Sequence, residues 1–294
     1  MNKQFGNKKT IALFVLPTLL LYVAFVFFPI AYNLYLSFLR TDLMSPSKFI
    51  GLQNYSNLFR DTFFKMALKN NLWLVIGSFC AHLPLALFFG NALFNKIKGS
   101  KFFQTVFFLP TVICGVAVGQ MFKMVVYHEE FGIINSALDL IGLTSLKHPW
   151  LGSESTVMLS MIFVVMWRFV GYHMVIQLAA MKAIPESLYE AADIAGATSW
   201  QKFTQITFPL IKHILRIDAV LIITGSLKYF DIIFSMTKGG PNHASEVMAT
   251  YMFYQGFRTM KFGYASAIGM ILLLMCILVI WIANRVFRTE QLEY

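Results

Sequence analysis

Charged residues are scarce in this chain. They make up 13% of its 294 residues, whereas an average soluble domain carries about 25%. A water-soluble globular protein is therefore excluded. Disorder is excluded as well, because disordered chains combine low hydrophobicity with high charge and 57% of these residues are hydrophobic. The composition predicts a polytopic membrane protein.

Cysteine is also rare, with three residues in the whole chain. Cys80, Cys114 and Cys276 lie far apart, each within an apolar run. This spacing provides neither a disulfide framework nor a metal site. We expect all three to be small hydrophobic residues packed within the membrane.

Motifs of catalysis are missing too. There is no G-x-x-x-x-G-K-[ST] phosphate loop, no H-E-x-x-H, no G-x-S-x-G and no Cys/His ligand cluster. Gly239–Gly240–Pro241 is a turn signal and not a phosphate cradle. His128–Glu129–Glu130 lies in a polar loop without a second histidine at helical spacing. We predict no catalytic residue, no metal site and no ATPase site in this chain.

Long apolar runs dominate what is present. A bilayer core about 30 Å thick needs about 20 apolar helical residues. Six segments meet that requirement: 11–39, 72–94, 102–122, 156–180, 214–236 and 264–283. The first contains Pro17 and Pro29, so we expect it to tilt or kink. It follows a basic start like a secretory signal, but it is too long and lacks a cleavage site, which indicates an uncleaved span.

Basic residues indicate the orientation of the spans. The net charge of +10 is scattered between the apolar runs, which is typical of flanks of membrane spans and not of a nucleic-acid surface. Lys3, Lys8 and Lys9 precede the first span, and Lys96, Lys98 and Lys101 crowd the short second loop. Both termini are therefore predicted to be cytoplasmic. We find no repeat or soluble domain, so residues 1–294 form a single transmembrane domain.

Two outer loops carry amphipathic stretches. In 55–69, Leu58, Phe59, Phe63 and Met66 fall on one helical face, which predicts a helix on the membrane surface. The stretch 131–146 is apolar but interrupted by glycine, and it predicts a short interfacial helix.

The fourth loop, 181–213, is long, and loops of this length are usually functional. Pro185 suits a first helical turn, and Ile184, Leu188, Ala191 and Ala195 line one face of the helix. Gly196 ends this helix, and a second, capped by Thr198 or Ser199, is predicted to end at Pro209. Such a helix-turn-helix either docks into a groove on a partner protein or rests on the lipid headgroups.

The order of small and acidic residues in this loop resembles the EAA loop of ABC-importer permeases. The residues that carry the resemblance are Glu190, Ala191, Ala192, Gly196, Ile206 and Pro209. Other segments resemble the carbohydrate-import branch of that family: Phe49–Tyr55, Leu109–Pro110, Trp167 with Gly171, Ala183–Glu186, Thr237–Pro241 and Phe262–Ala267. The segments follow one another in the right order and spacing, and the resemblance as a whole covers about residues 12 to 289.

Some positions depart from the family pattern. Ala195 replaces an aspartate before the loop glycine, which puts a cap or salt bridge there in doubt, and Phe208 replaces a leucine. Phe122 replaces a tryptophan and Asn71 a threonine.

The resemblance implies an all-α fold of six transmembrane helices with a cytoplasmic coupling helix. It implies one of two permease subunits of a sugar importer in a bacterial or archaeal plasma membrane. The expected partners are a second, different permease, cytosolic ATPases that bind the ATP and Mg²⁺, and an extracellular solute-binding protein. Nucleic acid is not expected, and this chain itself should bind no cofactor. Glu190 would provide the central polar contact to the ATPase, while Ala191, Ala192 and Gly196 would permit close approach.

Polar groups within spans are candidates for the transport path because their burial is costly. Arg168 lies beside Trp167, with Tyr172 and His173 a turn later; Arg168 could equally pair structurally between subunits. Lys228 and Asp231 could form an ion pair or, with Tyr229, face the cavity. We expect His82 and Asp218 to be satisfied by helix neighbours.

Two other classes of protein remain as alternatives. An ion-coupled secondary transporter or channel would use Arg168 and Asp231 and need no ATPase, but the long fourth loop argues against it. An intramembrane enzyme lacks any nucleophile–base or metal constellation. Which sugar is carried cannot be predicted, and polyols or glycerol phosphate are compatible with the same resemblance.

Overall fold

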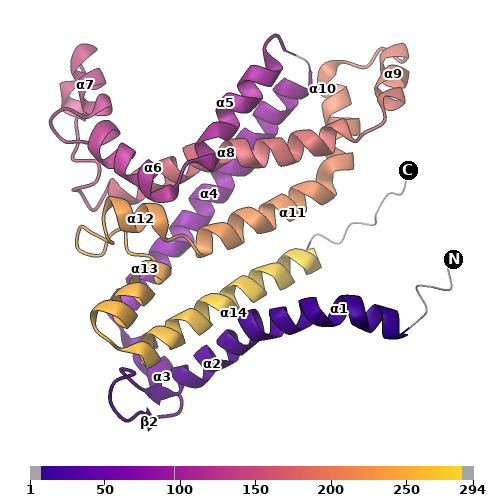
Figure 1. Ribbon diagram of the computed structural model, residues 1–294. Coiled ribbons are helices and arrows are strands. Elements are labelled where there is room, and N and C mark those ends of the chain that lie inside the picture. The colour runs from indigo at the N-terminus through magenta and orange to yellow at the C-terminus, as the bar shows by residue number, and fades with distance from the viewer. Residues whose placement is uncertain (1–7, 96, 287–294) are drawn as a thin grey trace. The chain divides into compact units, whose positions relative to one another are not determined.

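The computed structural model describes residues 8–95 and 97–286 (Figure 1). Lys3 and Lys96, on which the predicted orientation partly depends, lie outside these residues. The chain forms two compact units, one of residues up to 61 with 252–273, the other of 62–251 with the residues from 274 onward. The regular elements of the described residues are helices apart from one two-stranded antiparallel sheet. The all-α fold class is confirmed.

The first unit contains the N-terminal span and the beginning of the last helix. Its elements are α1 (Lys8–Tyr22), the π-turn η2 (Val23–Phe27), α2 (Phe28–Ser37), β1 (Leu39–Arg40), β2 (Lys48–Phe49), α3 (Gln53–Arg60) and η6 (Tyr254–Arg258). The irregularity that we expected prolines to cause in the first span is the π-turn η2. Pro29 is the second residue after it, and the missing N–H of proline loosens the helical ladder at this point.

The last helix, α14 (Phe262–Val286), begins in the first unit and ends in the second. Its first turns are fixed within the first unit by Tyr264, whose hydroxyl donates to Asp61 Oδ2 over 2.6 Å. Asn33 Nδ2 on α2 donates to the Ser266 carbonyl over 3.3 Å.

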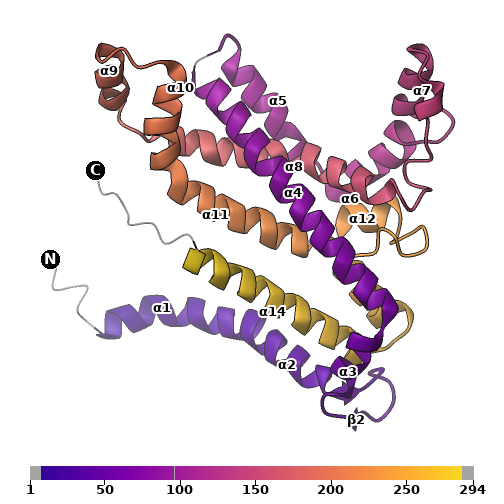
Figure 2. The same cartoon turned by 180° about the vertical axis from the view of Figure 1, so that it is seen from behind.

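The second unit contains the remaining helices. They are α4 (Thr62–Phe94), α5 (Ser100–Val112), α6 (Gly115–Met121), η3 (Phe122–Val126), α7 (Ile133–Leu140), η4 (Thr144–Leu146), α8 (Val157–Lys182), α9 (Glu186–Ile194), α10 (Ser199–Lys202), η5 (Phe203–Thr207), α11 (Phe208–Leu227), α12 (Asp231–Met236) and α13 (Met248–Phe253), the last of which runs into the first unit. The long helix α8 packs against α4, α5 and α11 (Figure 2).

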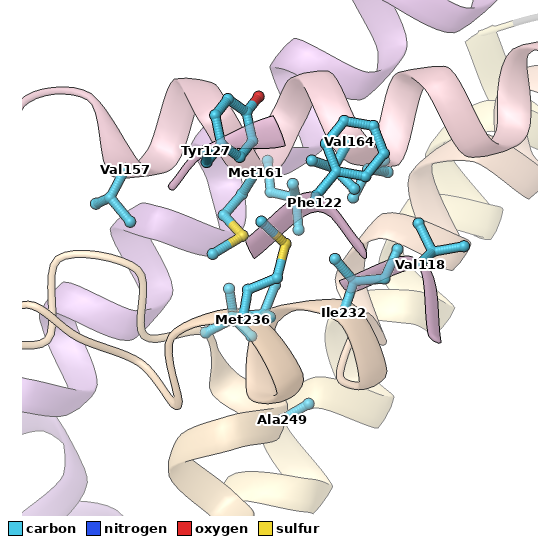
Figure 3. Packing of buried hydrophobic residues seen from close by; sticks show 13 residues of the cluster. Val118, Phe122, Tyr127, Val157, Met161, Val164, Ile232, Met236 and Ala249 are labelled. Atoms are coloured by element: carbon cyan, nitrogen blue, oxygen red, sulfur yellow. The ribbon is translucent and has the colours of Figure 1, made fainter. Parts of the chain in front are cut away.

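The core of the second unit lies where α8 meets the shorter helices α6 and α12. Figure 3 shows Met161 and Val164 of α8 facing Ile232 and Met236 of α12, with Phe122 beside them. All five side chains are buried. Because these apolar residues fill the space between three elements, they fix the positions of the short helices that could not hold themselves in place.

The third predicted span is not one straight helix. It is divided into α5 and a second part formed by α6 and η3, with a bend of 99° between them. Ile113 and Cys114 are extended at the break. Arg168 Nη2 donates to the Ile113 carbonyl over 2.9 Å. A carbonyl released from the helical ladder thus regains a partner, which permits the bend within an apolar region.

The fifth predicted span, 214–236, is also interrupted. Helix α11 ends at Leu227 and α12 begins at Asp231. Asn71 Nδ2 donates to the carbonyls of Ser226 and Leu227 over 3.4 and 3.2 Å, which satisfies the end of α11. The prediction of a continuous helix was wrong here because these partners come from α4.

Four described helices are long and apolar enough to cross a membrane: Ile11–Ser37, Thr62–Phe94, Val157–Lys182 and Phe262–Ala283. The bent pair Ser100–Val112 and Gly115–Val126 makes five if it is one span. Helix α11 does not meet the same test; it carries Lys212, Arg216 and Asp218. The count of six spans stays a prediction.

The amphipathic loop predictions have mixed outcomes. The stretch 55–69 is two helices, because the backbone is extended at Asp61 and α4 begins at Thr62. The apolar residues predicted to lie on one face do not have the same environment, since Leu58 is fully buried while Phe59 is exposed. In the stretch 131–146 the predicted helix is present as α7.

Candidate functional site

The fourth loop begins with a helix whose two ends are well defined. Pro185 is the N-cap of α9 and precedes the first turn instead of lying within it. At the other end Gly196 has φ +75°. The amide of Ala197 donates to the Ala192 carbonyl over 2.9 Å and that of Gly196 to the Asp193 carbonyl over 3.0 Å, which is the Schellman arrangement. The predicted helix stop at Gly196 is confirmed.

The second helix of the loop begins with a capping box. Thr198 Oγ1 accepts from the Gln201 amide, and the Gln201 side chain accepts from the Thr198 amide. The prediction that this helix ends at Pro209 was wrong. Helix α10 continues through the π-turn η5 into α11, and Pro209 lies in the first turn of α11, where its missing N–H is tolerated.

A tyrosine attaches α9 to the rest of the second unit. The Tyr189 hydroxyl lies 2.9 Å from Thr207 Oγ1, and its ring centroid lies 5.4 Å from that of Phe94 at the end of α4. Lys202 Nζ donates to Asp193 Oδ1 over 2.7 Å and joins α10 to α9. Sequence reasoning missed Tyr189. Its signal was that it is the single aromatic residue of α9.

A cavity of about 390 Å³ lies behind α9. It is lined by residues from the end of α4 and from both helices of the loop, including Asn91, Phe94, Lys182, Glu186, Tyr189 and Lys202. The loop and the end of α4 therefore enclose a space beside the contact that Tyr189 makes.

The outer face of the loop is exposed. Glu190 and Ala191 are exposed, Ala192 is half-buried, and no atom lies within 4 Å of a Cβ placed on Gly196. Two apolar side chains beside them are unusually open, Ile194 at 91% and Trp200 at 71%. Ile206 is half-buried in η5 and Pro209 is exposed on α11. The loop thus presents small and apolar side chains around one carboxylate, a surface suited to docking.

The predicted transport-path residues lie in three places. A cavity of about 310 Å³ between α4, α8 and α11 is lined by both predicted tyrosines, Tyr172 and Tyr229, and also by His82, His173 and Lys228. Trp167 does not line it. Its ring packs 5.2 Å from that of Phe122, at the edge of the core shown in Figure 3.

Arg168 and Asp231 lie together at the bend between α5 and α6. A Cβ placed on Gly115 would be 2.7 Å from Arg168 Nη1 and 3.3 Å from Asp231 Oδ2. The Arg168 guanidinium also lies 4.9 Å from the Phe169 ring. Among the described residues, no ion pair joins Lys228 to Asp231.

Asp218 and His82 are buried between helices. Asp218 accepts from His173 Nδ1 and from Gln177 Nε2 of α8, both over 2.7 Å. His82 Nε2 lies 3.2 Å from the Val165 carbonyl. Both Asp218 and His82 therefore have hydrogen-bond partners on the neighbouring helix α8. Within residues 8–95 and 97–286 no three His, Cys, Asp or Glu side chains form a group that could hold a metal ion.

Comparison with known proteins covers nearly the whole chain. The family model described as "Binding-protein-dependent transport system inner membrane component" matches residues 74–289. The probable ABC transporter permease protein YurN of Bacillus subtilis is 38% identical over 290 residues, 98% of this chain and 99% of YurN. The multiple sugar-binding transport system permease protein MsmF of Streptococcus mutans is 32% identical and covers 88% of each chain.

A solved structure shares the fold. It is a bacterial alginate ABC transporter in complex with an alginate pentasaccharide-bound periplasmic protein, and one of its chains matches with a TM-score of 0.84 at 24% identity. The match covers 97% of this chain and 96% of that chain.

Proposed function

Because the chain belongs to the family of binding-protein-dependent transport system inner membrane components, we propose that it is a permease subunit of an ATP-driven sugar or oligosaccharide importer. The sugar is supported by what similar proteins are named for: multiple sugars for MsmF and lactose for LacF of Rhizobium radiobacter, which is 32% identical over 90% of this chain.

The exposed fourth loop is the observation that carries the proposal. ATPase subunits dock on the face around Glu190, Ala191 and Gly196, and Glu190 makes the central polar contact. The carboxylate of Glu190 is exposed at the middle of α9, beside open apolar side chains. Docking would bury this face, so ATP-driven movement of the ATPases is transmitted to the spans through α9 and α10. ATP and Mg²⁺ are held by those partners.

The cavity between α4, α8 and α11 is the proposed start of the sugar path in this chain. Aromatic faces and hydrogen-bond donors hold sugars, and Tyr172, Tyr229 and Lys228 provide both. Arg168 and Asp231 extend the path to the bend between α5 and α6, while Trp167 supports it by packing. A second, different permease completes the path, and ATP shifts the pair between inward-open and outward-open states through differential contacts.

An extracellular solute-binding protein delivers the sugar. One solved relative in fold is bound to such a periplasmic protein. A permease with this function would lie in the plasma membrane of a bacterium or archaeon, with both termini in the cytoplasm.

Replacement of the central carboxylate tests the proposal. In proteoliposomes that contain the complete importer, Glu190→Ala removes a charge-assisted contact and should lower ATP-driven sugar uptake about tenfold. Uptake of radiolabelled sugar and ATP hydrolysis are measured together. Gln205→Ala, an exposed polar residue in the same loop, is the matched control and should leave uptake unchanged.

Two outcomes would contradict the proposal. Uptake that is normal in Glu190→Ala would show that the loop is not the coupling element. Uptake by the purified chain without any ATPase would favour an ion-coupled transporter.

A further inference from the structure

A buried polar triad lies beside the cavity between α4, α8 and α11. Asp218, His173 and Gln177 have relative exposures of 0, 5 and 0%. Both carboxylate oxygens of Asp218 are occupied, Oδ1 by His173 Nδ1 and Oδ2 by Gln177 Nε2, each at 2.7 Å. Such short bonds to a buried carboxylate are charge-assisted and hold the triad rigidly.

This arrangement decides which nitrogen of His173 carries the proton. An ionised carboxylate only accepts hydrogen bonds, so His173 Nδ1 must be the N–H donor. In the neutral ring, Nε2 then has a free lone pair. Within the described part of the chain Nε2 has no hydrogen-bond partner, and His173 lines the cavity of about 310 Å³. Lys228 lines the same cavity.

We propose that Asp218 is a positioning residue that fixes the tautomer of His173, so that Nε2 presents a hydrogen-bond acceptor to the transported molecule. The inference rests on the proposed transport function and deepens it. An acceptor at this position selects a ligand that can donate, which a sugar hydroxyl does. The ligand class is therefore a polyhydroxylated saccharide, with the Tyr172 ring, 5.1 Å from that of His173 by centroids, available beside it.

Asparagine at position 218 would reverse the polarity of this acceptor. Its oxygen would still accept from Gln177, so its amide nitrogen would face His173 and could only donate. His173 Nδ1 would then accept, and the proton would move to Nε2. The cavity would gain a donor where it had an acceptor, although the shape and packing of the triad stay the same.

The first measurement is the tautomer itself. The ¹⁵N NMR spectrum of the full-length permease in nanodiscs, labelled at its histidine ring nitrogens and assigned with His173→Asn, should show His173 protonated at Nδ1 only. In Asp218→Asn it should be protonated at Nε2 only. Gln177→Met is the matched control, because it removes a triad member but leaves the carboxylate, and it should retain the wild-type tautomer.

The second measurement is the amount of sugar moved per ATP hydrolysed. The complete importer is reconstituted with its binding protein, and ¹⁴C-labelled lactose, maltose and raffinose are tested, with the one that the wild type accumulates taken further. In Asp218→Asn uptake should fall about tenfold, as expected for one lost hydrogen bond, while binding-protein-stimulated ATP hydrolysis stays within about twofold. Gln177→Met weakens the support of the carboxylate but keeps the tautomer, so it should lose clearly less uptake than Asp218→Asn.

If Asp218→Asn does not fold, His173→Asn replaces it. Asparagine can still donate to Asp218 but has no atom at the position of Nε2, so it should show the same loss of uptake.

Three results would overturn the inference: a wild-type His173 protonated at both nitrogens, an unchanged tautomer in Asp218→Asn, or a changed tautomer with unchanged uptake. Equal loss of uptake and hydrolysis in Asp218→Asn and Gln177→Met would show a purely structural triad. If the proposed function itself is wrong, the result is different: the wild-type importer neither takes up sugar nor hydrolyses ATP. The NMR spectra still test the tautomer of His173 in that case.

Discussion

At the scale of the residue, Asn71 shows why a departure from the family pattern is not neutral. Its side chain is fully buried on α4. Nδ2 donates to the carbonyls of Ser226 and Leu227, and Oδ1 accepts from the Met248 amide over 2.9 Å. One side chain therefore provides hydrogen-bond partners for two backbone carbonyls at the end of α11 and for the backbone amide of the first residue of α13. The interrupted fifth span depends on this residue.

Threonine, the residue that the family resemblance led us to expect, cannot make these three bonds. Its hydroxyl donates once and lacks the reach of an amide. Asn71→Thr should therefore destabilise the permease by about 2 kcal/mol and lower its melting temperature in detergent, followed by tryptophan fluorescence. Asn95→Thr is the control, because within the described residues the Asn95 side chain bonds only to the Asn91 carbonyl, four residues earlier. Equal melting temperatures for the two variants would contradict the role of Asn71.

At the scale of the element, the long helices could be predicted and the breaks could not. Apolar length and proline positions were enough to identify α4, α8 and α14. The bend after Ile113 depends on Arg168, which is 55 positions further along the chain, and the end of α11 depends on Asn71. Pro110 lies shortly before the first break, but the position of each break is set at long range, because in both the carbonyls released from the ladder are satisfied by another helix.

The candidate site could be predicted only where its structure depends on neighbouring residues in the sequence. The Schellman stop at Gly196 is encoded locally, since glycine reaches a positive φ at low cost. Tyr189 could not be recognised as an anchor without knowing that Phe94 and Thr207 lie beside it. Likewise, Trp167 was expected to line the path, but its position in the core depends on Phe122, a residue of another segment.

The close approach of α5 and α8 depends on one glycine. A Cβ on Gly171 would lie 1.8 Å from the Phe107 carbonyl oxygen, which is backbone and cannot rotate away. Gly171→Ala should therefore separate the two helices and destabilise the protein by about 3 kcal/mol, at the upper end for overpacking. The measurement is the melting temperature and the yield of monodisperse protein in detergent.

Gly225→Ala is the matched control for this substitution. Gly225 is also helical, in α11, but no atom lies within 4 Å of its added Cβ. Alanine there should leave stability unchanged or raise it by up to about 1 kcal/mol, through helix propensity. If both variants lowered the melting temperature alike, close packing at Gly171 would not be the cause.

At the scale of the whole molecule, the chain exposes apolar side chains at two ends of its second unit. Ile194 and Trp200 lie on the fourth loop, and Leu140, 89% exposed, lies on α7 at the opposite end (Figure 1). Exposed apolar residues that add nothing to the stability of the free chain are available for assembly. Only those of the fourth loop lie beside Glu190, so the two ends should differ when the ATPase binds.

Ile194→Ser tests this difference. Burial of an isoleucine side chain on docking is worth about 2 kcal/mol, so this variant should retain roughly a tenth or less of the ATPase that co-purifies with the wild-type permease in mild detergent. Its melting temperature should not change, because the side chain makes almost no contact within the chain. Leu140→Ser removes an equally exposed side chain from the other end and should retain full ATPase. Equal loss in both variants would mean that exposed apolar area in general, and not the fourth loop, holds the partner.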